Sequence, residues 1–432
     1  MKLRALLPFL ATSIAALAAE PPVPQFRGVT LDAKVQIGYG LALADVDGDK
    51  ATDILLADKR QILWYRNPGK DKATDPAAWT RHVIAENLTE KDNVCIAAQD
   101  IDGDGKAEVA VGAEWNPGDT EKSGAVFYLV APTDRTQPWK AIKFPEVEPT
   151  THRMRWVKVD TAAPAKKGGK PVAQWGLLVQ PLHGRGNKAG EGVPVKVLLY
   201  HPPAGGAYES VPWKSEVVDE SLHASHNFVR LSLAGPSVPG VADSLLLGGK
   251  EGLVSLRRLG GKWQRTVPPM AGEKPPGVGE VRVGSLLAGT QFITTVEPMH
   301  GNQLAIYLPQ KAGAAPVPLE RRVLTDKLVD GHAIACGNLL GGLPGVSASD
   351  QIVVGWRGKV GTPGSTVGVA VWTPLDPRGE KWRETIIDSD GMACEDLQLA
   401  DLDGDGKLDI IAAGRATRNL KIYFNQTPAG GK

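Results

Sequence analysis

Three short stretches of the chain carry carboxylates at a spacing that suits a small cation. They begin at Asp45, Asp100 and Asp401, and each has carboxylates at positions 1, 3, 5 and 9 with glycine where the turn is tight. Ca²⁺ prefers such an oxygen shell, to which a backbone carbonyl at position 7 can add. Unlike EF-hand loops, they have no Glu at position 12, and an unmetallated Asp turn is the alternative. We expect structural Ca²⁺ at Asp45, Asp47, Asp49 and Asp53, at Asp100, Asp102, Asp104 and Glu108, and at Asp401, Asp403, Asp405 and Asp409.

Histidine is the second residue type that could hold a metal. The chain has eight histidines, and neutral imidazoles suit Zn²⁺, Mn²⁺, Fe²⁺ or Cu²⁺. A lone His before a strand is more often a turn residue that makes ordinary hydrogen bonds. A metal site therefore requires several of them to converge, which depends on the elements that carry them.

Those elements form a repeat. From Gly38 onward the chain repeats a unit of four short β-patterned segments, which in the first copy are 39–44, 53–57, 62–66 and 79–85. Four-stranded units at this spacing are typical of β-propeller blades. The fourth segment is recognised in six copies, near Trp79, Trp139, Trp213, Trp263, Arg321 and Trp382.

The two ends of the chain complete the count. The chain ends on a third-type segment, 420–424, and the segment 26–31 supplies the missing fourth. We therefore predict an all-β fold, a single seven-bladed β-propeller of four-stranded blades over residues 20–432. The N-terminal strand completes the C-terminal blade and closes the ring, which removes its open edges.

This geometry sorts the histidines. The Asp loops leave the inner strands at one face, so the starts of the inner strands and the turns between second and third strands lie at the other. Six of the eight histidines then point to one mouth of the channel. We predict His152, His226 and His332 as ligands of a divalent transition metal such as Zn²⁺ or Mn²⁺. The same mouth is predicted to bind a sugar, because Trp faces and Arg forks suit its ring and oxygens, through Trp115, Glu114, Trp356, Arg357, Arg415 and Asn93.

By its Asp-x-Asp-Gly-Asp-x-x-x-(Asp/Glu) motifs the chain resembles the FG-GAP or VCBS family of secreted propellers, which includes adhesion modules and enzymes. The runs THRMRW from Thr151, LHGRGN from Leu182 and HNF from His226 also resemble the propeller domain of aldos-2-ulose dehydratase. That resemblance implies a lyase that eliminates water or an alcohol from a keto sugar at a His-bound divalent metal. The cupin domains of the fungal enzyme have no counterpart here.

Elimination beside a carbonyl requires an electrophile on its oxygen, a base for the α proton and an acid for the leaving oxygen. We predict His183 or His300 as the base, with Tyr39 or Arg185 near the developing enolate. The expected function is a carbon–oxygen lyase acting on a keto sugar or 3-keto-glycoside. The alternative is a Ca²⁺-stabilised propeller that binds a carbohydrate or a protein partner without turnover.

Composition and the N-terminus bound the location and partners. Residues 1–19 have an early basic pair, an apolar run and a small-residue end, as in a signal peptide, so a secreted or periplasmic protein is expected. The 49 basic and 48 acidic residues are interspersed, which argues against nucleic acid, and no second apolar run could span a membrane. Three unevenly spaced cysteines, Cys95, Cys336 and Cys394, are expected to be buried thiols, although one pair could bridge.

Overall fold

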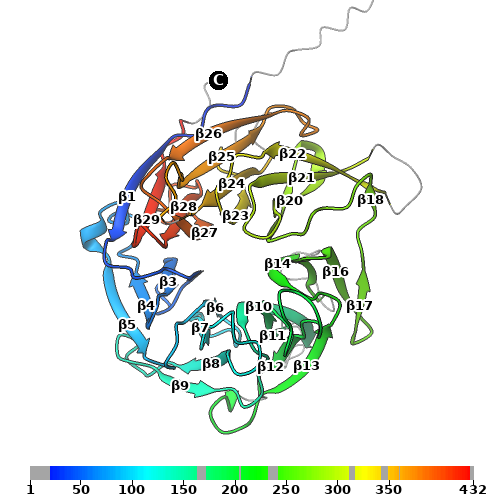
Figure 1. Ribbon diagram of the computed structural model, residues 1–432. Coiled ribbons are helices and arrows are strands. Elements are labelled where there is room, and N and C mark those ends of the chain that lie inside the picture. The colour runs from blue at the N-terminus through cyan, green and yellow to red at the C-terminus, as the bar shows by residue number, and fades with distance from the viewer. Residues whose placement is uncertain are drawn as a thin grey trace, which may run out of the picture.

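The computed structural model is a closed ring of seven antiparallel sheets around a central channel (Figure 1). It describes residues 20–162, 172–203, 206–231, 242–310, 317–341, 349–359 and 361–428. The predicted signal peptide, residues 1–19, lies outside them. The prediction of a seven-bladed all-β propeller is confirmed.

The first three blades each have four strands in chain order from the channel outward. They are β2 (Gly40–Ala44), β3 (Asp53–Ala57), β4 (Gln61–Arg66) and β5 (Thr80–Glu86); β6 (Cys95–Gln99), β7 (Glu108–Ala113), β8 (Ala125–Val130) and β9 (Lys140–Lys143); and β10 (Thr151–Ala162), β11 (Val172–Pro181), β12 (Val197–His201) and β13 (Lys214–Asp219).

Blades 4 to 6 follow the same order, and the short β18 adds a parallel fifth strand to the outer edge of blade 5. They are β14 (Ser225–Leu231), β15 (Ser244–Gly249), β16 (Gly252–Leu259) and β17 (Lys262–Thr266); β19 (Glu280–Ser285), β20 (Gln291–Glu297), β21 (Gln303–Pro309), β22 (Leu319–Thr325) and β18 (Met270–Ala271); and β23 (Gly331–Gly337), β24 (Gln351–Trp356), β25 (Gly368–Pro374) and β26 (Trp382–Asp388).

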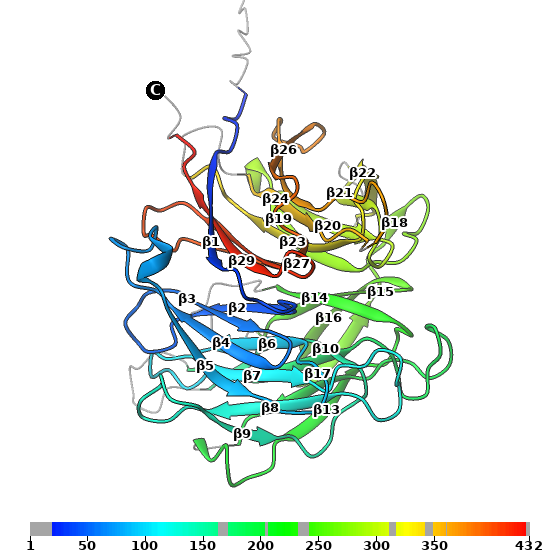
Figure 2. The same ribbon diagram turned by 60° about the vertical axis from the view of Figure 1, so that its left-hand side comes forward.

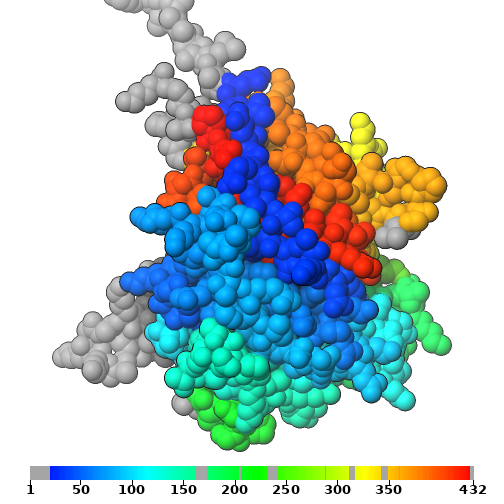
Figure 3. Space-filling model, turned by 90° about the vertical axis from the view of Figure 1, so that its left-hand side faces the viewer, coloured from blue at the N-terminus to red at the C-terminus, as the bar shows by residue number. Residues whose placement is uncertain are grey.

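Blade 7 is built from both ends of the chain, as predicted. Its strands are β27 (Cys394–Ala400), β28 (Asp409–Gly414), β29 (Asn419–Asn425) and β1 (Phe26–Asp32), and β1 pairs antiparallel with β29 from Phe26 opposite Asn425 to Asp32 opposite Leu420. Figures 2 and 3 show the blue N-terminal segment lying against the red C-terminal blade. Two short 3₁₀ turns, η1 (Pro76–Ala78) and η3 (Leu287–Gly289), interrupt the β pattern.

The core lies between the faces of neighbouring blades. One cluster joins blade 1 to blade 7 through fully buried side chains such as Ile54, Leu63 and Ile411. The three cysteines are free thiols, and Cys95 and Cys394 are buried. Among the described residues no helix is long and apolar enough to cross a bilayer. The ring is therefore held by apolar contacts between blades and by the β1–β29 pairing.

Deleting residues 24–32 should remove the closing strand and expose the edge of β29, which favours aggregation through unpaired backbone groups. We expect a melting temperature lower by 10 °C or more, on the order of several kcal/mol of lost stability, together with soluble aggregates in size-exclusion chromatography. Thr30→Ala, an exposed position on the same strand, is the matched control and should change neither. A monomeric truncated protein with unchanged melting would contradict the closure.

Candidate functional site

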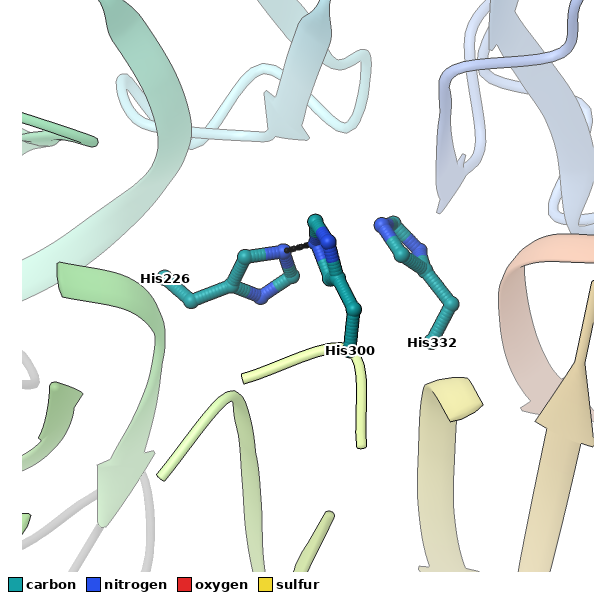
Figure 4. Close-up of side chains that lie close together, drawn as sticks. All are labelled: His226, His300 and His332. Atoms are coloured by element: carbon teal, nitrogen blue, oxygen red, sulfur yellow. Dashed lines mark hydrogen bonds between the residues drawn. The ribbon is translucent and has the colours of Figure 1, made fainter. Parts of the chain in front are cut away.

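Three histidines from three blades meet at one mouth of the channel. His226 and His332 are each the second residue of an inner strand, β14 and β23, whereas His300 comes from the turn between β20 and β21 and has a positive φ of 52°. Ligand atoms of the three rings lie within 4.8 Å of one another. Figure 4 shows the rings directed toward a common point, and His300 Nε2 lies 2.7 Å from His226 Nε2. We call this set the His trio.

Backbone and carboxylate oxygens orient two of the rings. His332 Nδ1 donates to the carbonyl oxygen of Glu395 at 2.6 Å, and His226 Nδ1 lies 3.0 Å from Glu280 Oε1, where both groups are fully buried. The hydrogen bond of His332 Nδ1 leaves Nε2 of that ring with the lone pair, and Nε2 of His226 faces Nε2 of His300. Such partners behind a ligating imidazole are the usual support of a metal centre, so the trio fits a divalent transition ion.

The predicted ligand His152 lies beside the trio but is not part of it. Its ring centroid is 4.5 Å from that of His226 and 5.0 Å from that of Trp115, on which it stacks. Its Nδ1 lies 2.9 Å from the carbonyl oxygen of His226, and Arg153 Nη1 lies 3.1 Å from its Nε2. Both ring nitrogens of His152 therefore have protein partners. The third ring beside His226 and His332 is that of His300.

A network of charged side chains adjoins the trio. Arg357 contacts both oxygens of Glu395, at 2.8 and 3.0 Å, and bonds Asp330 at 2.9 Å, while its Nη2 lies 3.4 Å from His300 Nδ1. Arg415 also bonds Glu395, at 3.2 Å, and its guanidinium lies 5.5 Å from the centre of the Tyr39 ring. Glu395 thus fixes two guanidiniums at the edge of the trio.

Tyr39 ends this chain of contacts. Its hydroxyl donates to Asp92 Oδ2 at 3.2 Å, and burial raises its pKa, as do the carboxylates of Asp92 and Glu395. The phenol therefore stays protonated near neutral pH. Tyr39, Arg357 and Arg415, all predicted from the sequence, are brought to the same mouth as the trio.

The imidazoles of the mouth are neutral near pH 7. Burial holds the pKa of His152, His226 and His332 well below its ordinary value, and neighbouring guanidiniums act in the same direction. Burial and the charge of Arg357 lower the pKa of His300 to about 4. Neutral imidazole is the form that ligates metal ions.

Other predicted site residues make their contacts elsewhere. The backbone of His183 forms an isolated β-bridge with Ala224, and its buried Nδ1 has no hydrogen-bond partner in the described part of the chain. Arg185 donates to the carbonyl oxygens of Glu121 and Val147. Trp356 is 8 % exposed and packs in the core of blades 5 and 6, over the space left by Gly368.

Two further residues predicted for the mouth have backbone contacts that explain their positions. Asn93 is buried, and its amide holds the carbonyl oxygen of Asp58 at 2.9 Å. Glu114 has a positive φ of 57° in the turn before Trp115, and its backbone amide donates to Thr89 Oγ1. Of the predicted sugar-binding residues, Trp115 stacks on His152 and Arg357 lies beside His300.

Three acidic residues of this region carry no distinctive sequence signal. Glu280 opens β19 behind His226, Asp330 precedes β23 beside Arg357, and Asp92 lies in the loop before β6 under Tyr39. Each stands among many carboxylates in the chain. The one available clue is position, because each lies at or just before the start of an inner strand, as His226 and His332 do.

The Asp loops have nearly the same geometry in all three copies. In each, the carboxylates at positions 1, 3 and 9 have oxygens within 4.8 Å of one another: Asp45, Asp47 and Asp53; Asp100, Asp102 and Glu108; Asp401, Asp403 and Asp409. The carboxylates at position 5, Asp49, Asp104 and Asp405, lie outside these groups and each accepts a backbone amide two residues on. Burial raises the pKa of Asp53, Glu108 and Asp409 to about 7.

Comparison with known families agrees with this architecture. Residues 45–111, which hold the first two Asp loops, match the FG-GAP-like repeat. Residues 123–310 match the aldos-2-ulose dehydratase beta-propeller domain. The chain is similar to both, as its motifs predicted. The second match includes His152, His226, Glu280 and His300, whereas His332, Arg357 and Glu395 lie beyond it.

Comparison with solved structures shows the fold alone. A structure of BBS1N in complex with ARL6DN is 12 % identical over 95 % of this chain and 99 % of that chain, with a TM-score of 0.52. A lectin from Agrocybe aegerita that recognises non-reducing terminal N-acetylglucosamine is 12 % identical over 84 % of this chain and 81 % of that chain, with a TM-score of 0.41. No curated protein matches the sequence.

Arg357 should be more important for stability than its neighbour Arg415. Arg357→Met leaves Glu395 and Asp330 without their shared guanidinium in a largely buried place, which should lower the free energy of unfolding by about 3 kcal/mol. Arg415→Met is the matched control: its side chain is 42 % exposed, so about 1 kcal/mol or less is expected. Urea denaturation of both variants measures the difference. Equal losses would show that Arg357 does not hold this network together.

Proposed function

We propose that the protein is a secreted or periplasmic carbohydrate-active lyase that eliminates water or an alcohol from a keto sugar or 3-keto-glycoside at the His trio. The observation that carries this proposal is the convergence of His226, His300 and His332 within 4.8 Å of one another. A mouth that only bound a glycan would need no such convergence. The similarity of residues 123–310 to the aldos-2-ulose dehydratase propeller supports the same reaction class.

The trio would hold a divalent transition ion such as Zn²⁺ or Mn²⁺ through the ring nitrogens that face one another. The ion, when bound, supplies a Lewis acid that polarises the carbonyl of the keto sugar. The protein keeps the three imidazoles neutral and directs their ring nitrogens toward one another. The carbonyl oxygen of Glu395 fixes the ring of His332, and the Glu280 carboxylate lies 3.0 Å from Nδ1 of His226. In this proposal His300 is the third ligand, in place of His152.

The surrounding side chains suit the charge and proton movements of an elimination. Arg357 and Arg415, both held by Glu395, face the negative charge that grows on an enolate oxygen. The Tyr39 hydroxyl, kept protonated by burial, suits the acid that protonates the leaving oxygen. Its partner Asp92 suits the base that takes the α proton. Trp115, stacked on His152, offers an aromatic face for the sugar ring.

Replacing any member of the trio by Ala should remove the transition metal and the turnover together. His226→Ala, His300→Ala and His332→Ala remove a ligand each, so we expect metal content to fall at least tenfold by elemental analysis. Release of an enone from a keto sugar or 3-keto-glycoside, followed by ultraviolet absorbance, should fall by at least a factor of 100. His152→Ala is the matched control, because both nitrogens of that ring already have protein partners, and it should retain metal.

The other outcomes are equally informative. If His300→Ala keeps the metal but loses turnover, His300 is the base and not a ligand. If His152→Ala loses the metal while His300→Ala keeps it, the original triad is correct. Wild-type protein that carries no transition metal and releases no unsaturated product from any keto sugar would leave the alternative, a propeller that binds a carbohydrate or protein partner without turnover.

We propose further that the three Asp loops bind structural Ca²⁺. In each loop the buried carboxylate at position 9 accepts a hydrogen bond from at least one backbone amide. Asp53 accepts from Val46 and Asn67, Glu108 from Ile101, and Asp409 from Leu402 and Asn425. The oxygens at positions 1 and 3 are brought to within 4.8 Å of it. Without a cation, three carboxylates so close repel one another. A bound Ca²⁺ removes that repulsion and so stabilises the fold.

Calcium should raise the melting temperature more at pH 8 than at pH 6. The pKa of Asp53, Glu108 and Asp409 is about 7 without an ion, above its ordinary value. Without an ion, the folded protein therefore loses stability as the pH rises from the ordinary pKa of a carboxyl group toward 7. At pH 6 these carboxyl groups are largely protonated, so Ca²⁺ must displace protons to bind. Asp403→Ala with Asp405→Ala should reduce the Ca²⁺ effect by about a third. Asp71→Ala, an exposed carboxylate outside the loops, should not.

Thermal melts in chelator and in millimolar Ca²⁺ at the two pH values provide the measurement. Identical curves with and without chelator would rule out bound Ca²⁺. A larger gain at pH 6 than at pH 8 would show that these carboxylates are not the ligands.

A further inference from the structure

A second polar site lies inside the channel, farther along the inner strands than the His trio. A cavity of about 390 Å³ there is lined on one side by Arg155, Arg230 and Arg282, which come from the neighbouring inner strands β10, β14 and β19. The opposite wall is small, apolar or amide in character, with residues such as Ala42, Ala98 and Gln398. No carboxylate is among the residues that line the cavity.

Most of the donors on two of these guanidiniums have no partner among the described residues. Arg155 makes one long hydrogen bond, from Nε to the carbonyl oxygen of Phe228 at 3.4 Å, and none from its two terminal nitrogens. Arg282 donates from Nη1 to the carbonyl oxygen of Val281 at 2.7 Å, and its Nε and Nη2 make no hydrogen bond. Each guanidinium offers five N–H donors in a fork that matches an oxyanion.

Nearby carboxylates compensate the positive charge only in part. Glu280 Oε2 lies 3.6 Å from Arg282 Nη1 but also accepts a hydrogen bond from Asn227 at 2.7 Å and faces His226 with its other oxygen. The carboxylate oxygens of Asp396 accept hydrogen bonds from the backbone amides of Leu41 and Leu397.

The guanidiniums also repel each other. Burial, together with the charge of Arg282, lowers the pKa of Arg155 to about 10, so Arg155 remains cationic at neutral pH. Two cations that line one cavity without a carboxylate among its lining residues repel each other, and a bound anion would remove that repulsion.

We propose that this cavity is a binding site for a small organic oxyanion, a carboxylate or a phosphate ester. Arg155 and Arg282 both donate hydrogen bonds to the charged group of this anion, and Arg230 lies at its side. The remainder of the anion packs against the apolar wall. The volume is within the range of small-molecule sites. The site lies farther along the channel than the His trio, because Arg155 and Arg230 follow His152 and His226 along β10 and β14, and Arg282 follows Glu280 along β19.

Anion binding can be measured on the wild-type protein by isothermal titration calorimetry. The probes are inorganic phosphate, sulfate and benzoate, each titrated at an ionic strength held constant with chloride. We expect saturable binding of at least one probe at one site per chain. Phosphate and sulfate without benzoate would assign the site to phosphate esters, and benzoate without the others to carboxylates. The bound probe should also raise the melting temperature of the wild-type protein as its concentration increases.

Substitutions locate the bound anion. Arg155→Gln and Arg282→Gln keep an amide but remove the charge, and each should weaken binding at least tenfold. Arg265→Gln, an exposed arginine on β17, is the matched control, and Arg415→Gln tests the His mouth; both should bind as the wild type does. Arg282→Lys, which keeps the charge but loses the fork, should be intermediate and covers the case in which a glutamine variant fails to fold.

Three results would overturn the proposal. One is the absence of saturable binding of all three probes to wild-type protein. Another is unchanged affinity in folded Arg155→Gln and Arg282→Gln. The third is loss of binding in Arg415→Gln, which would place the anion at the His trio.

Discussion

The pairing of β1 with β29 is the interaction on which the rest of the structure depends. It supplies the fourth strand of blade 7, and blade 7 carries much of the support for the mouth. Glu395 on β27 binds Arg357 and Arg415 with its carboxylate and His332 with its carbonyl oxygen. The next residue, Asp396, accepts the amide of Leu41 from blade 1. A strand from the N-terminus therefore holds in place a site whose histidines lie hundreds of residues away.

A closed ring also separates two kinds of polar chemistry. The Asp loops follow the inner strands β2, β6 and β27 at one face. At the other face, His226 and His332 stand at the starts of the inner strands β14 and β23, and His300 lies in the turn between β20 and β21. Hard carboxylate oxygens and softer imidazole nitrogens select different cations, so two ion classes need not compete for the same residues. The arginines of the channel lie between the two faces.

Strand order and position could be predicted from the sequence because they follow from repetition. The Asp loops, the Trp-led outer strands and the stray N-terminal segment were enough for the blade count, and the start of each inner strand indicated the mouth. The direction of each side chain could not be predicted from the repeat. His152 and His226 occupy equivalent positions, yet the ring of His152 turns onto Trp115 and the backbone of His226. His300 reaches the trio from a turn with positive φ, which no periodicity encodes.

Two predicted sugar-binding residues, Trp356 and Asn93, show how local contacts set the direction of a side chain. Trp356 is the last residue of β24 and packs inward because Gly368, opposite it in β25, leaves room for the indole. Asn93 is used to hold a backbone carbonyl between blades. An aromatic or an amide at the right face of a propeller is therefore not necessarily exposed to a ligand. Pairing partners, such as a glycine across the ladder, decide which way it faces.

The arginines around the His trio are compatible with the cation that we propose there, because they favour the neutral form of its ligands. A histidine binds a metal only when neutral. The charge of Arg153 lowers the pKa of His152, His226, His300 and His332 further than burial alone does, and Arg357 acts in the same direction on the last three. The positive charge that this arrangement introduces is balanced locally by Glu395 and Asp330 around Arg357. Glu280 has a second task, because it lies within 3.0 Å of His226 on one side and 3.6 Å of Arg282 on the other. The Glu280 carboxylate thereby lies between the His226 imidazole and the Arg282 guanidinium. A change of charge on either side chain alters the electrostatic potential at the other.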